Sequence, residues 1–161
     1  MRRHFTATAF VVDEGKTLLH WHRKLRQWMP PGGHLLEDED PVAGVLREVR
    51  EETGLAVALL PLTPTFSFDY PQQLSAPYTI LIENSAEAGE PHQHIDLIYF
   101  CRPLGGETAT PVVADDTLVW VTEAQLQRNE ALPLGNRDVP IAEDVRLLAL
   151  EALRVAREIR N

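Results

Sequence analysis

The sequence predicts a mixed α/β fold, and three observations support this prediction. Short apolar or alternating segments typical of β-strands occupy much of the chain. Only two long segments show the periodicity of an amphipathic helix, one lying between strand-like segments and the other ending the chain. Strands, one helix, more strands and a terminal helix suggest a mixed sheet with helices on both faces.

The first two strands are predicted over residues 4–12 and 17–22, which are apolar and partly alternating. The polar residues 13–16, which include Gly15, form the turn that joins them. Two prolines and two glycines at residues 30–33 then interrupt regular structure.

A helix is predicted from residue 41, because Asp40 is a suitable N-cap and Pro41 is favourable at the first helical position. Gly54 is well placed to end this helix. Its apolar stripe, which lies beside an acidic face, consists of Val42, Val45, Leu46, Val49 and Thr53. One face of the helix is therefore expected to pack on the sheet, while the neighbouring face borders a cleft.

Further strands are predicted at 55–61, 64–70, 78–83, 95–102 and 117–121, with a polar loop at 84–93. A short helix opens at Thr122, and residues 140–160 form a long helix. This last helix also carries Leu147, Leu150 and Leu153, which widen its apolar surface beyond one face. Because packing on one sheet needs only one apolar face, the extra surface favours a homodimer.

The composition indicates a single globular domain over residues 1–161, with 44% hydrophobic and 24% charged residues. The formal net charge of −9 argues against general nucleic-acid or membrane binding. No signal peptide or membrane span is expected at the N-terminus. The single cysteine, Cys101, lies in an apolar run and is expected to be a core thiol, which is compatible with a reducing cytoplasm.

The most informative pattern is G-x5-E-x7-R-E-U-x-E-E-x-G-U over residues 33–55, where U is an apolar residue. Its fixed positions are filled by Gly33, Glu39, Arg47, Glu48, Val49, Glu51, Glu52, Gly54 and Leu55. In a helix, the last three glutamates lie within an arc of about 100°. Like charges at these spacings cost about 0.2–0.5 kcal/mol per pair, so a purely structural helix would disperse them. The cluster instead offers hard oxygen ligands to a divalent cation.

This pattern is similar to the signature of the Nudix hydrolases, and the resemblance is complete over residues 33–55. It implies an α/β/α sandwich with a mixed sheet, which is more specific than the α/β class predicted from periodicity. It also implies a hydrolase that depends on Mg²⁺, with Mn²⁺ as a substitute. The implied substrate is a small-molecule nucleotide in which a nucleoside diphosphate is linked to another moiety. Nucleotide sugars, ADP-ribose, dinucleotide polyphosphates and nucleoside triphosphates all fit this description.

Two alternatives on the same fold are a catalytically inactive nucleotide-sensing module and a prenyl-diphosphate isomerase. Loss of a glutamate from the pattern would mark the first, and none is missing. The second needs an acid–base cysteine, and Cys101 inside an apolar strand is poorly placed for that role.

The resemblance, carried over position by position, implies the metal ligands Glu48, Glu51 and Glu52. A further ligand is implied at the backbone carbonyl near Gly32, which would explain a residue without Cβ there. Arg47 is placed to pair with Glu51 one turn later, and Glu39 to support the metal or the loop. The general base is one of the glutamates or an acid from a later loop. The loop candidates are Asp115, Asp116 and, next in order, Glu123.

Substrate contacts are predicted in three places, each with a structural alternative. Basic residues before Trp28 either gather an anionic substrate or form a solvated turn: Arg23, Lys24 and Arg26. Alternating aromatic residues either stack on a nucleobase or belong to a half-buried strand: Phe66, Phe68 and Tyr70. The alternating His92, His94 and Asp96 point to one side of an extended segment. A phosphate or base contact by His94 or Asp96, a zinc site and an ordinary polar strand face all remain open for this segment.

Overall fold

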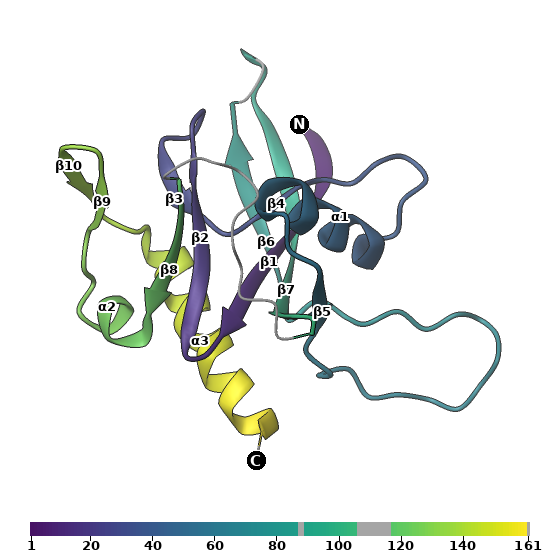
Figure 1. Cartoon of the computed structure of the whole chain (residues 1–161). Coiled ribbons are helices and arrows are strands. Elements are labelled where there is room, and N and C mark those ends of the chain that lie inside the picture. The colour runs from purple at the N-terminus through teal and green to yellow at the C-terminus, as the bar shows by residue number, and fades with distance from the viewer. Residues whose placement is uncertain (87–88, 106–116, 161) are drawn as a thin grey trace.

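The computed structural model describes residues 1–86, 89–105 and 117–160, and it places a mixed sheet between helices (Figure 1). The helices are α1 (Pro41–Thr53), α2 (Glu123–Gln127) and α3 (Glu143–Arg160). The strands are β1 (Arg2–Asp13), β2 (Lys16–His22), β3 (Gln27–Met29), β4 (Gly32–His34), β5 (Val57–Leu59), β6 (Thr79–Ser85), β7 (His92–Pro103), β8 (Leu118–Thr122), β9 (Leu132–Leu134) and β10 (Arg137–Val139).

The sheet is built around β1 and β7, which run parallel in register from Arg2↔His92 to Val11↔Cys101. The other edge of β1 pairs antiparallel with β4 and, at its end, with β2. The other edge of β7 pairs antiparallel with β5 and β6, and β2 pairs antiparallel with β3 and β8. The predicted mixed sheet is thus confirmed.

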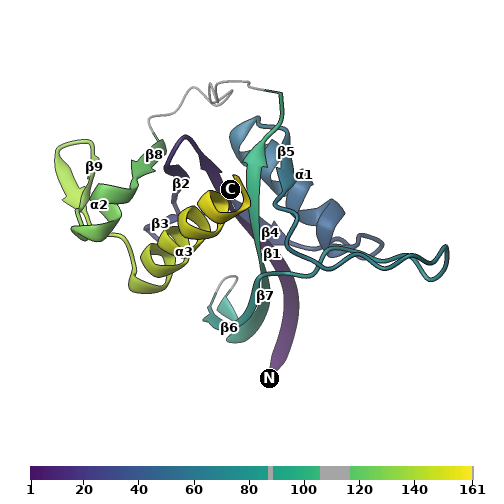
Figure 2. The same cartoon turned by 90° about the horizontal axis from the view of Figure 1, so that it is seen from below.

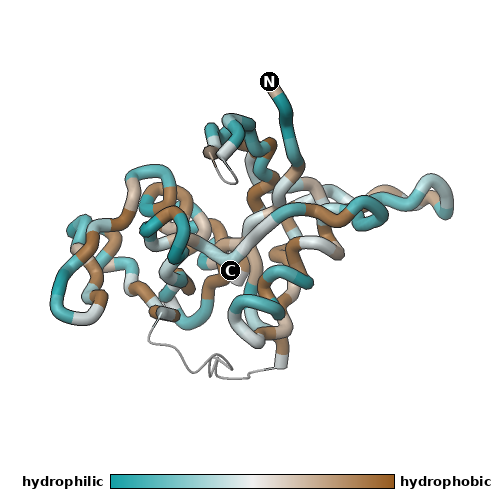
Figure 3. The backbone as a smooth tube through the Cα atoms, turned by 90° about the horizontal axis from the view of Figure 1, so that it is seen from above, coloured by the Kyte–Doolittle hydropathy of each residue, from teal (hydrophilic) through white to brown (hydrophobic). Residues whose placement is uncertain are grey.

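Side chains of β1 and β7 alternate between two cores on opposite faces of the sheet. Odd-numbered residues such as Ala7 and Leu97 pack with Val49 of α1. Even-numbered residues such as Phe10 pack with Ala152 of α3. Figure 2 shows α1 and α3 on either side of the central strands, and Figure 3 shows hydrophobic stretches where the helices meet the sheet. The period of two along each strand therefore produces the α/β/α sandwich.

Helix α1 begins and ends as predicted. The Asp40 side chain accepts a hydrogen bond from the backbone N–H of Ala43 at 2.8 Å, and Gly54 ends the helix with a φ of 75°. Gly44 is buried within the helix, where a Cβ would overlap the Leu35 side chain and lie 2.9 Å from Glu39 Oε1. The loop before the helix therefore packs closely on α1 here, and a larger residue would displace these two side chains.

The strand predicted at 64–70 is wrong. Residues 60–78 instead form an irregular loop that projects from the body (Figures 1 and 3). Four prolines in this loop restrict the backbone and remove hydrogen-bond donors: Pro61, Pro64, Pro71 and Pro77. The short strands β3, β4, β9 and β10 were not predicted. In β4, the edge of β1 supplies hydrogen-bonding partners to a Gly-Gly segment of low strand propensity.

Helix α3 starts at Glu143, three residues later than predicted. Leu153 is buried and Leu150 packs against the α3-side core, whereas Leu147 is 49% exposed. Most of the extra apolar surface that favoured a homodimer is therefore buried within the chain. Among the described residues, no helix is long and apolar enough to cross a membrane.

Candidate active site

Arg47 on α1 joins the acidic side chains of the pattern over residues 33–55 into one cluster. Its Nε and Nη2 donate to the two carboxylate oxygens of Glu39 at 2.7 and 2.8 Å. Its Nη1 donates to Glu48 at 3.0 Å and to Glu51 at 3.1 Å, so the predicted pair with Glu51 is present. Nη2 also donates to the backbone oxygen of His34 at 3.1 Å, which ties β4 to the helix. One guanidinium thus orients three carboxylates and the strand beside them.

The charges in this cluster shift the pKa values of its members in opposite directions. Hydrogen bonds from Arg47 lower the pKa of Glu39, and the same pairing raises the pKa of Arg47. Burial raises the pKa of Glu48, and this effect exceeds the opposing hydrogen bond from Arg47. Glu39 therefore stays ionised as a structural anchor, while Glu48 is a desolvated carboxyl with a larger affinity for protons.

Gly33 and Gly32 lack side chains for two different reasons. A Cβ on Gly33 would lie 2.6 Å from Glu48 Oε1, so this glycine leaves room for the carboxylate. A Cβ on Gly32 would lie 2.6 Å from both the Ala7 backbone oxygen and Thr8 Oγ1. Close packing of β4 on β1 therefore accounts for the missing Cβ at Gly32 without any metal ligand.

Glu52 extends the acidic cluster toward β2. Its Oε2 lies 3.0 Å from His20 Nε2, yet this buried oxygen has no hydrogen-bond partner among the described residues because the close pair is not aligned as a hydrogen bond. Side-chain exposure is 14% for Glu48, 26% for Glu52 and 59% for Glu51, so the acids run from a buried to an open position. Three carboxylates graded in this way, one with an unsatisfied oxygen, fit a hard divalent cation.

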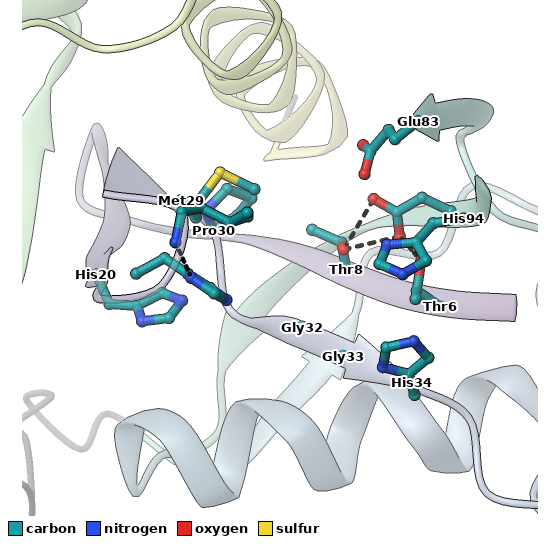
Figure 4. A pocket seen from close by; sticks show the side chains of 13 residues that line it. Thr6, Thr8, His20, Met29, Pro30, Gly32, Gly33, His34, Glu83 and His94 are labelled. Carbon is teal, nitrogen blue, oxygen red and sulfur yellow. Dashed lines mark hydrogen bonds between the residues drawn. The ribbon is translucent and has the colours of Figure 1, made fainter. Parts of the chain in front are cut away.

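A cleft opens beside the cluster, between His20 and Met29 on one side and Glu83 and His94 on the other (Figure 4). Its lining consists of Thr6, Thr8, His20, His22, Leu25, Met29, Pro30, Gly32, Gly33, His34, Glu83, His94 and Asp96. The predicted contacts His94 and Asp96 are thus both in the cleft. Arg23 and Arg26 are exposed in the turn between β2 and β3, next to the lining residues His22 and Leu25.

A pair of carboxyl groups forms the wall of this cleft on the α3 side. Thr6 Oγ1 and Thr8 Oγ1 donate to Asp96 at 2.9 and 2.8 Å, and Asp96 is 4% exposed. Burial, followed by the charge of Asp96, raises the pKa of Glu83 to about 7. Glu83 was not among the predicted site residues. Its position two residues after the inward-facing Leu81, on the same face of the strand at 78–83, was the signal that could have identified it.

Three predicted substrate contacts lie elsewhere. Trp28 is 1% exposed, packs edge-on against Trp21 in the α3-side core and does not line the cleft. Phe68 and Tyr70 are 51% and 89% exposed on the projecting loop, where Phe68 stacks on Phe66 and does not reach the cleft. Alternation predicts which side chains share one face of an extended segment, but it does not predict whether that face lines a pocket.

The candidate bases from later loops are only partly described. Asp115 and Asp116 lie outside the described residues. Glu123, the next candidate, forms an ion pair with Arg157 of α3 and begins α2. That pairing assigns Glu123 to the contact between the two helices.

Fold and site together define a class of protein, an α/β/α sandwich with an arginine-organised carboxylate cluster on one helix beside a cleft. Comparison with known proteins identifies the family. Residues 2–145 match the NUDIX domain, so the chain belongs to that family. A MutT-like protein of Streptomyces ambofaciens is 29% identical over 131 residues, which cover 80% of this chain and 70% of that relative.

Solved structures agree with this assignment. A NUDIX-family hydrolase from Clostridium perfringens superimposes with a TM-score of 0.72 at 28% identity, covering 97% of this chain and 99% of the other. The MutT NUDIX hydrolase from Burkholderia pseudomallei has a TM-score of 0.57 at 22% identity, covering 94% and 98%, and shares the fold. The family match and the first of these structures support a hydrolase of the pyrophosphohydrolase class.

Proposed function

We propose that this protein is a Mg²⁺-dependent hydrolase that cleaves the phosphoanhydride of a nucleoside diphosphate linked to another moiety. The observation that supports this most strongly is the Arg47 cluster. One guanidinium holds Glu39, Glu48 and Glu51 together beside Glu52, whose buried oxygen has no hydrogen bond from the part of the chain that the structure describes. Carboxylates crowded in this way are stabilised by a cation, and Mg²⁺ prefers such ligands together with phosphate oxygens.

The metal ligands in this proposal are Glu48, Glu51, Glu52 and the Gly32 backbone carbonyl. Mg²⁺ bound there would neutralise phosphate oxygens and lower the pKa of a bound water. The protein's own contribution is orientation, because Arg47 fixes two of the carboxylates and Gly33 leaves the space that Glu48 occupies. Asp115 and Asp116 are the proposed sources of the general base, with Glu48 as the alternative.

The cleft is the proposed site for the rest of the substrate. Its polar side chains, which include His20, His22, His34 and His94, offer donors to the ribose, phosphate or distal group. Arg23 and Arg26 at its mouth supply positive charge in a chain whose formal net charge is −9. An anionic substrate is therefore attracted to this edge of the molecule and to a bound cation rather than to the surface in general.

The two alternative functions are less compatible with the site. Cys101 is fully buried on the α1 face, and burial raises the pKa of its thiol to about 12, so it is unsuited to the acid–base step of an isomerase. An inactive nucleotide sensor would have no need for an intact acidic cluster, and all its members are present and hydrogen-bonded or ion-paired.

The test is a panel of nucleotide substrates incubated with Mg²⁺ or Mn²⁺, with products identified by mass. We expect activity to vanish with a chelator and return with metal. Glu51→Gln and Glu52→Gln should each lower kcat by at least about 10²-fold while circular dichroism stays unchanged. Glu37→Gln, at an exposed acid in the loop before α1, is the matched control. Full activity of both glutamine variants, or activity in the chelator, would refute the proposal.

We also propose a cytoplasmic homodimer, on grounds independent of catalysis. The buried Cys101 thiol has no disulfide partner, which suits a reducing compartment. Phe5, Ile82 and Ile80 are 56%, 61% and 55% exposed on one face of β1 and β6, and this apolar patch replaces α3 as the proposed contact surface. Light scattering should give a mass near twice 18.1 kDa, and a mass near 18.1 kDa would contradict the dimer.

A further inference from the structure

Four of the six histidines gather at one end of the sheet, on the face opposite α1. His4 comes from β1, His34 from β4, and His92 and His94 from β7. The ring centroids of His4 and His92 are 4.9 Å apart, those of His4 and His34 are 5.4 Å apart, and those of His34 and His94 are 4.7 Å apart. Figure 4 shows His34 and His94 facing each other across the cleft wall. Three separate strands thus converge on one group of imidazoles.

We propose that His4, His34 and His92 form a binding site for a zinc-class transition-metal ion, separate from the acidic cluster on α1. Each residue offers one ring nitrogen, and the three nitrogens lie within 4.8 Å of one another. Tetrahedral zinc with imidazole ligands needs nitrogens about 3.4 Å apart, given metal–nitrogen distances of about 2.0–2.1 Å. Small side-chain rotations on fixed strands would close this difference.

The hydrogen bonds of His92 prepare it as a ligand. Its Nδ1 lies 2.9 Å from the backbone oxygen of Glu90, and a carbonyl can only accept, so Nδ1 carries the proton. The lone pair of the neutral ring is then on Nε2, which faces the cluster. Metal-ligating histidines typically donate their other N–H to a carbonyl or carboxylate in this way. The Nε2 lone pair accepts from His94 Nε2 at 3.0 Å, and an incoming ion would displace that proton donor.

His4 provides the second indication of a ligand. Its Nε2 is buried and has no hydrogen-bond partner within the described part of the chain. Buried polar atoms in folded proteins nearly always have a partner. A metal ion between the three rings would bond this nitrogen without any rearrangement of the backbone.

The donor set also distinguishes this site from the acidic cluster. Imidazole nitrogens without a carboxylate suit Zn²⁺, Co²⁺ or Ni²⁺, whereas the carboxylates on α1 suit Mg²⁺. The two sites meet at β4, where Gly33 faces Glu48 and His34 joins the histidines. Three protein ligands leave a fourth position for water or an anionic oxygen. An ion there would also tie β1, β4 and β7 together.

The test uses untagged protein and Co²⁺ in excess Mg²⁺, which occupies the acidic cluster. We expect one equivalent of Co²⁺ with the intense visible absorption of a tetrahedral nitrogen site, displaced by Zn²⁺. Zn²⁺ at a hundredfold excess over its Kd should raise Tm by roughly 5–10 °C. The proposed site does not depend on hydrolase activity, so the Glu51→Gln variant should keep both signals.

Variants at the histidines decide whether this assignment is correct. His34→Gln is the first choice because His34 is exposed and its replacement should not affect folding. It should weaken Co²⁺ binding at least about 100-fold, beyond the 10–100-fold usual for partners outside the ligand sphere. His92→Gln should do the same, while the double variant His20→Gln, His22→Gln should bind normally. An unchanged Co²⁺ spectrum in folded His34→Gln and His92→Gln proteins, or no Co²⁺ retained in excess Mg²⁺, would overturn the proposal.

Discussion

Replacing Glu83 with glutamine should make the protein more stable above neutral pH. Burial, then the charge of Asp96, raises the pKa of Glu83 from 4.5 to about 7, and the charge of Asp144 adds to the effect. The folded protein therefore binds a proton that the unfolded chain releases. The resulting stability is fully present below about pH 4.5 and is lost as the pH rises through about 7.

The magnitude follows from the two pKa values. The difference between 4.5 and about 7 corresponds to about 3.4 kcal/mol if it is realised in full. Glu83 keeps partial contact with water in the cleft, so screening reduces the expected loss to about 1–3 kcal/mol. A glutamine at this position donates a hydrogen bond as the protonated acid does, and it does so at every pH.

Urea unfolding of the wild type and Glu83→Gln at about pH 5 and about pH 8 measures this effect. The two proteins should have similar stability at the lower pH, and the variant should be more stable by about 1–3 kcal/mol at the higher. Taking the difference between the proteins removes the titration of the six histidines, which is common to both. Glu37→Gln, at an exposed acid, should run parallel to the wild type. Equal pH dependence in the wild type and Glu83→Gln would refute the raised pKa of Glu83.

Three further outcomes are expected. Arg47→Lys should lower kcat about 10-fold or more and the free energy of unfolding by about 1–3 kcal/mol. The reason is that one ammonium group cannot reproduce the hydrogen bonds to Glu39, Glu48 and Glu51, and unchanged kinetics would refute the orienting role of Arg47. Trp28→Ala should lower the free energy of unfolding in urea by about 3–5 kcal/mol, while KM for the best substrate stays constant. A raised KM in a variant that is still stable would instead support a substrate contact by Trp28. Asp115→Asn or Asp116→Asn should lower kcat by about 10²–10⁴ while leaving metal affinity unchanged, and unaltered pH–rate profiles in both would transfer the base to Glu48.

The elements that sequence predicted well are those with strong local signals. Helix α1 has an N-cap at Asp40, a proline at its first position and a glycine at its end, and all three act within the helix itself. The acidic face could be predicted from spacing because a helix places i, i+3 and i+4 on one side whatever surrounds it. The same reasoning predicted the Arg47–Glu51 pair, which is present at 3.1 Å.

Contacts between distant segments could not be predicted in this way. Glu39 was expected only to support the metal or the loop, and its two bonds from Arg47 depend on how the loop folds back on α1. Trp28 and Phe68 were both plausible aromatic contacts, yet the first is buried and the second exposed on the projecting loop. Burial of that kind is decided by which strands pair and by where four prolines prevent pairing.

Strand β4 shows how the sheet separates two kinds of chemistry over adjacent residues. Gly33 pairs with Ala7 and faces α1, where its missing side chain accommodates Glu48. His34 pairs with Thr6 and faces the opposite side, where its ring meets His94 and His4. Because side chains alternate with a period of two, slipping β4 by one residue would put an imidazole against Glu48 and a glycine among the histidines. The register of this three-residue strand therefore determines the oxygen-rich site and the nitrogen-rich cluster together.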